Sequence, residues 1–203
     1  SASPLIVPAW SQTTYTVTYI PIDDALAEDN TPDTNYGSAS VYQVNRYDYV
    51  YLKFNLSDIS LPVERIVSAK IKVRNPNSNE NYGTLKACVV TDDTWEEEQL
   101  TYNNRPSISS YCSVGVTPTS WTELDVTSIL SYAIDVNDKI ASFVLDYYYA
   151  LSDGAVIHIA SKEYAQAEYW PQLVIEYEPY TETQTEVVTE TVTVTETTTE
   201  TIT

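Results

Sequence analysis

The sequence predicts an all-β protein: a β-sandwich of the jelly-roll or immunoglobulin-like kind, with one short helix and a long extended strand at the C-terminus. Two observations support this prediction. The 203 residues include 18 tyrosines and only 4 glycines, with many valines, isoleucines and threonines, and aromatic and β-branched residues favour strands. Apolar and polar residues also alternate in short segments between turns, which is typical of antiparallel sandwiches.

Seven segments show the alternation that predicts strands with one buried face. In chain order they are 15–20, 50–54, 69–73, 85–90, 140–145, 156–160 and 173–177. Turn residues separate them, as in Asn75-Pro76-Asn77 and Asp153-Gly154, because these residue types favour tight turns. The order of the segments predicts many short strands and no long helix.

One short helix is predicted near residue 125. Asp125 or Thr127 can serve as its N-cap. Four apolar side chains then fall on one helical face, namely Val126, Ile129, Leu130 and Ala133. We expect this helix to close one end of the sandwich.

The composition excludes several classes of partner. The net charge is −19, from 29 acidic and 10 basic residues, so nucleic acid and anionic membrane surfaces would be repelled. No apolar run approaches the roughly 20 residues that a membrane-spanning helix needs. The chain begins at Ser1 and has no methionine, so we expect that a leader was removed from an exported protein.

Two cysteines, Cys88 and Cys112, lie 24 positions apart. Two inert thiols are one interpretation. In an exported chain an even pair more often forms a disulfide, which would stabilise a loop of this size by about 3 kcal/mol. Export also favours glycosylation at Asn55, in the sequon Asn55-Leu56-Ser57.

Several motifs resemble a domain family named for its DNRLRE motif, which is related to carbohydrate-binding modules. The motifs appear in the family's order, from Asn35-Tyr36-Gly37-Ser38 through 51–56, 68–71, 94–106 and 125–127 to Ser161-Lys162-Glu163 and 171–173. Together they extend over about residues 14 to 178. The resemblance implies a jelly-roll-like β-sandwich from a family whose members often bind polysaccharide or lie on cell surfaces.

Sugar binding would require exposed aromatic rings. The candidates are Trp95, Trp121, Trp170 and the run Tyr147-Tyr148-Tyr149. Trp95 belongs to a motif that we expect to pack in the core, and alternation would bury Tyr148 or both its neighbours. We therefore expect most of these rings to be core residues.

No catalytic residue, metal ligand or cofactor site is predicted. The single histidine, His158, lies within a strand and has no serine or cysteine motif beside it. Carboxylates cluster at Asp23-Asp24, Glu28-Asp29, Asp92-Asp93 and Glu96-Glu97-Glu98, but their spacing matches no EF-hand loop. A glycosidase carboxylate pair has no positive support either.

Composition changes after residue 180, so we divide the chain into a head, 1–180, and a tail, 181–203. The tail holds 12 threonines, 5 glutamates and 4 valines, with no glycine or proline. It is interpreted as a solvated spacer, as a glycosylated stalk, or as a strand donated to a neighbouring molecule. Its β-branched residues and two distinct faces favour the third, with apolar contacts from Val187, Val188, Val192, Val194 and Ile202.

With this tail, the whole chain resembles the subunits of archaeal surface filaments called threads, which are secreted, glycosylated and joined by donor-strand complementation. The resemblance implies an extracellular structural protein whose partner is a second copy of itself, in a filament for adhesion or cell contact. An alternative is a polysaccharide-binding surface module with a solvated or glycosylated tail. The segment Leu5-Ile6-Val7 is a second candidate for a strand that crosses between subunits.

Overall fold

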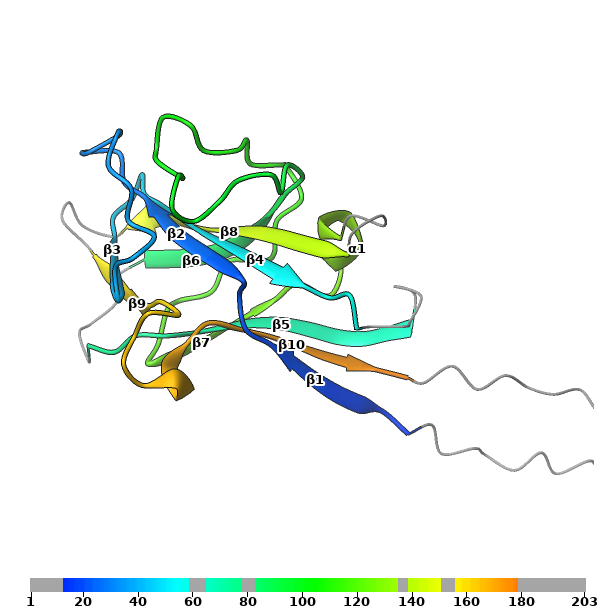
Figure 1. Ribbon diagram of the computed structural model, residues 1–203. Helices are drawn as coiled ribbons and strands as arrows, with labels where there is room; N and C mark the ends of the chain where they lie inside the picture. Colours follow the sequence, from blue (N-terminus) through cyan, green and yellow to red (C-terminus); the bar gives the residue numbers. More distant parts are fainter. Residues whose placement is uncertain (1–12, 59–64, 78–82, 135–138, 151–155, 179–203) are drawn as a thin grey trace, which may run out of the picture.

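A computed structural model describes residues 13–58, 65–77, 83–134, 139–150 and 156–178, without the side chains of 148–150. It confirms an all-β fold (Figure 1). The strands are β1 Tyr15–Tyr19, β2 Asp23–Ala27, β3 Val41–Val44, β4 Tyr49–Asn55, β5 Ile66–Arg74, β6 Gly83–Val90, β7 Trp121–Asp125, β8 Ile140–Ala150, β9 Ile157–Ala160 and β10 Gln172–Tyr177. The helices are α1 Leu130–Ala133 and the 3₁₀ helix η2 Ala167–Tyr169.

Two antiparallel four-stranded sheets form the sandwich. Sheet A has the order β1-β10-β5-β7, and sheet B has the order β2-β4-β8-β6. Figure 1 shows the two sheets as separate layers, one facing the other. Strands β3 and β9 form a two-stranded sheet of their own. Strands that are distant in the sequence therefore meet in each sheet, as in jelly rolls.

The main core fills the space between the sheets. In β5, Ala69, Ile71 and Val73 are buried and contribute to this core, while Lys70 between them is exposed. Sheet B contributes large side chains from its central strands, including Phe54 and Phe143. In β5, alternation in the sequence thus predicts which face of the strand is inward.

A second apolar cluster covers the outer face of sheet B. It joins Tyr51 and Val144 of the sheet to Trp95 and Leu100, which lie in the long segment 91–120 between β6 and β7. Tyr51 also donates a hydrogen bond from its hydroxyl to the carbonyl oxygen of Pro106, over 2.8 Å. Both faces of sheet B are therefore packed.

Cys88 and Cys112 form a disulfide, as the sequence predicts. The bond lies where the segment around Cys112 runs antiparallel beside β6. Backbone hydrogen bonds continue this pairing, from Ser113 N–H to Ala87 O over 2.7 Å and from Val89 N–H to Tyr111 O over 2.9 Å. The disulfide therefore holds the covering segment against the outer strand of sheet B.

All seven predicted strands are present, but β2, β3 and β7 were not predicted. Strand β2 begins with two aspartates, which are rare in strands, and is held by pairing with β4. Strand β3 has only four residues and pairs with β9. These strands depend on tertiary partners, which a local pattern does not contain.

The short helix is present, but it begins later than predicted. Asp125 is the last residue of β7, because β7 pairs with β5 up to that position. Its side chain caps the turn that follows by accepting the Thr127 N–H over 2.9 Å, whereas the helix cap at Ile129 has no side-chain hydrogen bond. The four predicted face residues are buried, which confirms the packing of this segment.

Two of the predicted features lie outside the described residues. These are the tail, with Val187, Val188, Val192, Val194 and Ile202, and the N-terminal segment Leu5-Ile6-Val7. The donor-strand hypothesis and the division at residue 180 stay predictions. Among the described segments, no helix has the length and apolar character required to cross a bilayer.

Candidate functional site

The outer face of sheet A carries exposed polar and aromatic side chains, in contrast to the packed outer face of sheet B. In β7, Trp121, Glu123 and Asp125 are exposed, while Thr122 and Leu124 between them are buried. Cross-strand partners share a face, and the register places Arg74 opposite Trp121, Lys72 opposite Glu123 and Lys70 opposite Asp125. This row of partners forms a continuous surface, which we call the sheet A face.

Trp121 is the large apolar side chain on the sheet A face and is 36% exposed. The guanidinium carbon of Arg74 lies 5.8 Å from its ring centroid and 4.9 Å from that of Tyr169. Tyr169 comes from η2 and stacks on Tyr164 with 5.5 Å between centroids. The site is therefore an aromatic and cationic surface built from β5, β7 and the turn before β10.

The cations of this face differ in their partners. Lys70 and Lys72 both pair with Glu123, at 3.1 and 3.2 Å, and the hydrogen bonds from these two lysines lower the pKa of Glu123. Within the described segments Arg74 forms no ion pair, and its buried Nε has no hydrogen-bond acceptor. Arg74 therefore offers a positive charge that has no acidic partner among the described residues.

The other predicted platform residues lie elsewhere. Trp95 is 7% exposed and Tyr147 is fully buried, which confirms both as core residues. Trp170 is half-buried, and its Nε1 donates to the carbonyl oxygen of Tyr164 over 2.8 Å. The side chains of Tyr148 and Tyr149 lie outside the described part of the chain.

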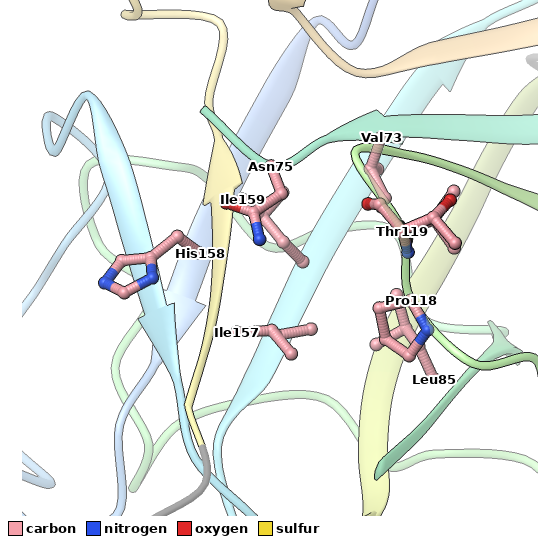
Figure 2. Close-up of a pocket in the computed structure, with 9 residues that line it drawn as sticks. Val73, Asn75, Leu85, Pro118, Thr119, Ile157, His158 and Ile159 are labelled. Carbon is pink, nitrogen blue, oxygen red and sulfur yellow. Dashed lines mark hydrogen bonds between the residues drawn. The ribbon is translucent and has the colours of Figure 1, made fainter. Parts of the chain in front are cut away.

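A small cavity near β9 does not offer a ligand site. Its volume is about 10 Å³, which is at the lower limit for one water molecule. Apolar side chains such as Val73, Leu85 and Ile157 line it. Figure 2 shows the ring of His158 on the side of β9 away from Ile157. A surface is therefore a better candidate than this cavity.

Two further predicted features are located but not tested. Asn55 is exposed at the end of β4, and its Oδ1 accepts the Ser57 N–H over 2.9 Å. The attachment of a glycan there stays a prediction. Two of the acidic clusters have local partners, since Asp23 pairs with Lys53 at 2.9 Å and Asp92 accepts hydrogen bonds from Thr94.

Arg74 and Tyr169 were missed by the sequence interpretation. The alternation Lys70-Ile71-Lys72-Val73-Arg74 does contain a signal, since it places three cations on one face of a strand. Tyr169 has no comparable signal, because only the turn through η2 brings it beside β5.

Comparisons with known proteins find two similarities. A stretch of 123 residues is 28% identical to a protein described as "Gellan lyase" from Bacillus sp, and it takes in 57% of this chain but only 5% of that protein. Residues 15–177 match the model of carbohydrate-binding module family 96, a family of binding modules. Together with the disulfide, this match indicates a secreted or extracellular protein. The chain belongs to carbohydrate-binding module family 96.

Proposed function

We propose that this chain binds polysaccharide through the sheet A face, with Trp121 packed on a sugar ring and Arg74 paired with an acidic sugar unit. The observation that carries the proposal is the position of an exposed tryptophan beside a cation that has no acidic partner in the described segments. The function is binding, with no catalytic step.

A row of exposed side chains along neighbouring strands suits an extended sugar chain. One side of a sugar ring presents C–H groups, which pack on the negative face of an indole ring. Around Trp121, Lys72 and Glu123 offer hydrogen-bond donors and acceptors for hydroxyl groups. Gln172 extends this polar row onto β10, opposite Lys72. Stacking would thus fix the ring plane, and the polar row would fix its orientation.

Arg74 adds a preference for acidic sugars. A guanidinium forms two parallel hydrogen bonds with a carboxylate, which a lysine does not. The net charge of −19 opposes a polyanion at long range. At physiological salt, however, charges beyond about 8 Å are largely screened. The local charge of Arg74 therefore decides the preference.

A matched pair of polymers tests this function. Polygalacturonate should bind, and the same polymer after reduction of its carboxyl groups should bind roughly tenfold more weakly, since the charge-assisted hydrogen bond is lost. Affinity electrophoresis and calorimetry on both polymers measure the difference. Equal binding to both would refute the role of Arg74, and the absence of binding to a broad panel of polysaccharides would refute the proposed function itself.

A filament of head-to-tail copies is the second candidate. What supports it is the position of β1 at the edge of sheet A, where it pairs with β10 alone among the described strands. An edge strand can accept one more strand from another chain. Electron microscopy of the full chain beside a version ending at Tyr180 tests this hypothesis. Filaments from the full chain alone would support it, and single particles from both would reject it.

A further inference from the structure

Three carboxylates from separate parts of the chain meet near the junction of β2 and β9. Asp24 lies in β2, Glu97 in the segment after β6, and Glu163 in the turn after β9. One oxygen from each lies within 4.8 Å of one oxygen from each of the others. We call these three residues the acidic triad.

Asp24 is fully buried, and only one of its two carboxylate oxygens accepts a hydrogen bond among the described residues. One carboxylate oxygen, Oδ2, accepts the backbone N–H of Lys162 over 2.9 Å. The other, Oδ1, has no hydrogen-bond donor among the described residues, although the side chain is 0% exposed. Burial raises the pKa of this carboxyl to about 8, an effect that Glu163 and Glu97 increase. A cation bound at Oδ1 would offset the cost of ionising this buried carboxyl, so the oxygen without a donor points to a cation site.

Lys162 compensates the triad only in part. Its Nζ contacts Glu97 and also lies 2.8 Å from Oε1 of Glu163. The second oxygen of Glu163, Oε2, is buried and has no donor among the described residues. The positive charge of one lysine therefore compensates three carboxylates only in part. Two buried oxygens, Oδ1 of Asp24 and Oε2 of Glu163, could bind an ion without breaking the hydrogen bonds of Lys162.

The backbone holds the triad in position. The N–H of Asp24 donates to Oε2 of Glu97 over 3.2 Å. Asn35 donates from Nδ2 to the carbonyl oxygens of Glu97, over 2.6 Å, and of Leu100, over 2.8 Å. A Cβ atom at Gly37 would lie 2.4 Å from the Glu97 carbonyl oxygen, so this close approach requires glycine. The carboxylates are thus fixed before any ion arrives.

We propose that Asp24, Glu97 and Glu163 form a calcium site. Calcium takes about six to eight oxygen ligands at about 2.3 to 2.6 Å, and three carboxylate oxygens within 4.8 Å of one another can meet in such a shell. Three protein carboxylates suit calcium, because magnesium usually keeps several waters and is bound by only one or two carboxylates. Water would complete the coordination shell. The ion would tie β2 to the segment after β6 and to the turn after β9.

Thermal unfolding of the full chain measures this binding. After treatment with a chelator and dialysis, calcium chloride at about 100 times its Kd should raise the Tm by about 5 to 10 °C, because the ion binds the folded state alone. Magnesium chloride at the same concentration should give a smaller shift. The absence of any shift with calcium up to 10 mM would refute the site.

Terbium luminescence locates the ion. The hydroxyl of Tyr42 donates to the carbonyl oxygen of Asp24 over 3.0 Å, so excitation of this ring should sensitise terbium bound at the triad. Added calcium should displace the terbium and so reduce the luminescence. Glu163→Gln and Asp24→Asn should each lower the affinity at least tenfold, whereas Glu98→Gln, an exposed carboxylate of the same segment, should not.

These variants distinguish ion binding at the triad from non-specific ion binding to the acidic surface of the protein. A terbium signal that does not saturate, or that responds equally to Glu163→Gln and Glu98→Gln, would overturn the proposal. If Asp24→Asn does not fold, the titration of the wild-type protein and Glu163→Gln still decide the question. The readouts involve no sugar, so they are independent of the proposed function.

Discussion

Replacement of Trp121 by alanine is expected to weaken polysaccharide binding by roughly 30-fold, or about 2 kcal/mol, which is the usual loss at a central aromatic contact. The side chain lies on β7 at the edge of sheet A and is 36% exposed. Since it lies outside both apolar clusters, its removal should change the Tm little. Calorimetry with the preferred polysaccharide and a melting curve measure the two effects.

Two variants serve as controls for this prediction. Tyr132 is 52% exposed and stacks on Tyr111 with 4.0 Å between ring centroids, away from the sheet A face, so Tyr132→Ala should bind normally. Arg74→Lys keeps the charge but loses the planar fork, so it should weaken binding to the acidic polymer more than to the reduced one. Unchanged binding by Trp121→Ala would show that sugars bind elsewhere.

The sequence predicted the fold class and the inward face of strands such as β5 because both follow from local alternation. In β5, for example, Ile71 is buried and Lys70 is exposed, as the alternation predicts. The three missed strands have weak local signals. Their pairing partners are distant in the chain, as Leu52 is for Asp24, and a short window of sequence does not contain those partners.

The candidate binding face was harder to predict than the fold. The sequence places Lys70, Lys72 and Arg74 on one side of a strand, but it does not say which sheet faces stay open. That depends on the segment 91–120, which covers sheet B through Trp95 and the disulfide and leaves the sheet A face accessible. The neighbours of Arg74 likewise depend on tertiary pairing, which places it opposite Trp121 of β7.

The acidic triad, like the binding face, could not be predicted from local sequence. The sequence interpretation predicted no metal site because it compared the spacing of neighbouring carboxylates with that of a single calcium loop. The triad instead takes one carboxylate from each of three segments, and Glu163 was not among the acidic clusters considered. A site assembled by tertiary contacts leaves no spacing pattern in the sequence.

Replacement of Trp95 by alanine is expected to lower the free energy of unfolding by about 3 to 5 kcal/mol, the range for a large buried aromatic residue. Trp95 is 7% exposed. Its ring meets Tyr51 edge-on at 5.8 Å and lies 4.5 Å from Nζ of Lys53. Its Nε1 has no acceptor among the described residues, so the loss comes from packing and from the cation contact. Denaturant unfolding followed by circular dichroism measures it.

The alanine variants of Trp95 and Trp121 together distinguish an effect on stability from an effect on polysaccharide binding. Trp95 packs between sheet B and its covering segment, whereas Trp121 lies on the opposite layer. Below its lowered Tm, Trp95→Ala should therefore bind polysaccharide with an affinity within about twofold of the wild type, since distant sites act independently. A large loss of binding in folded Trp95→Ala would move the sugar site to the sheet B side, because nothing on the sheet A face contacts that ring.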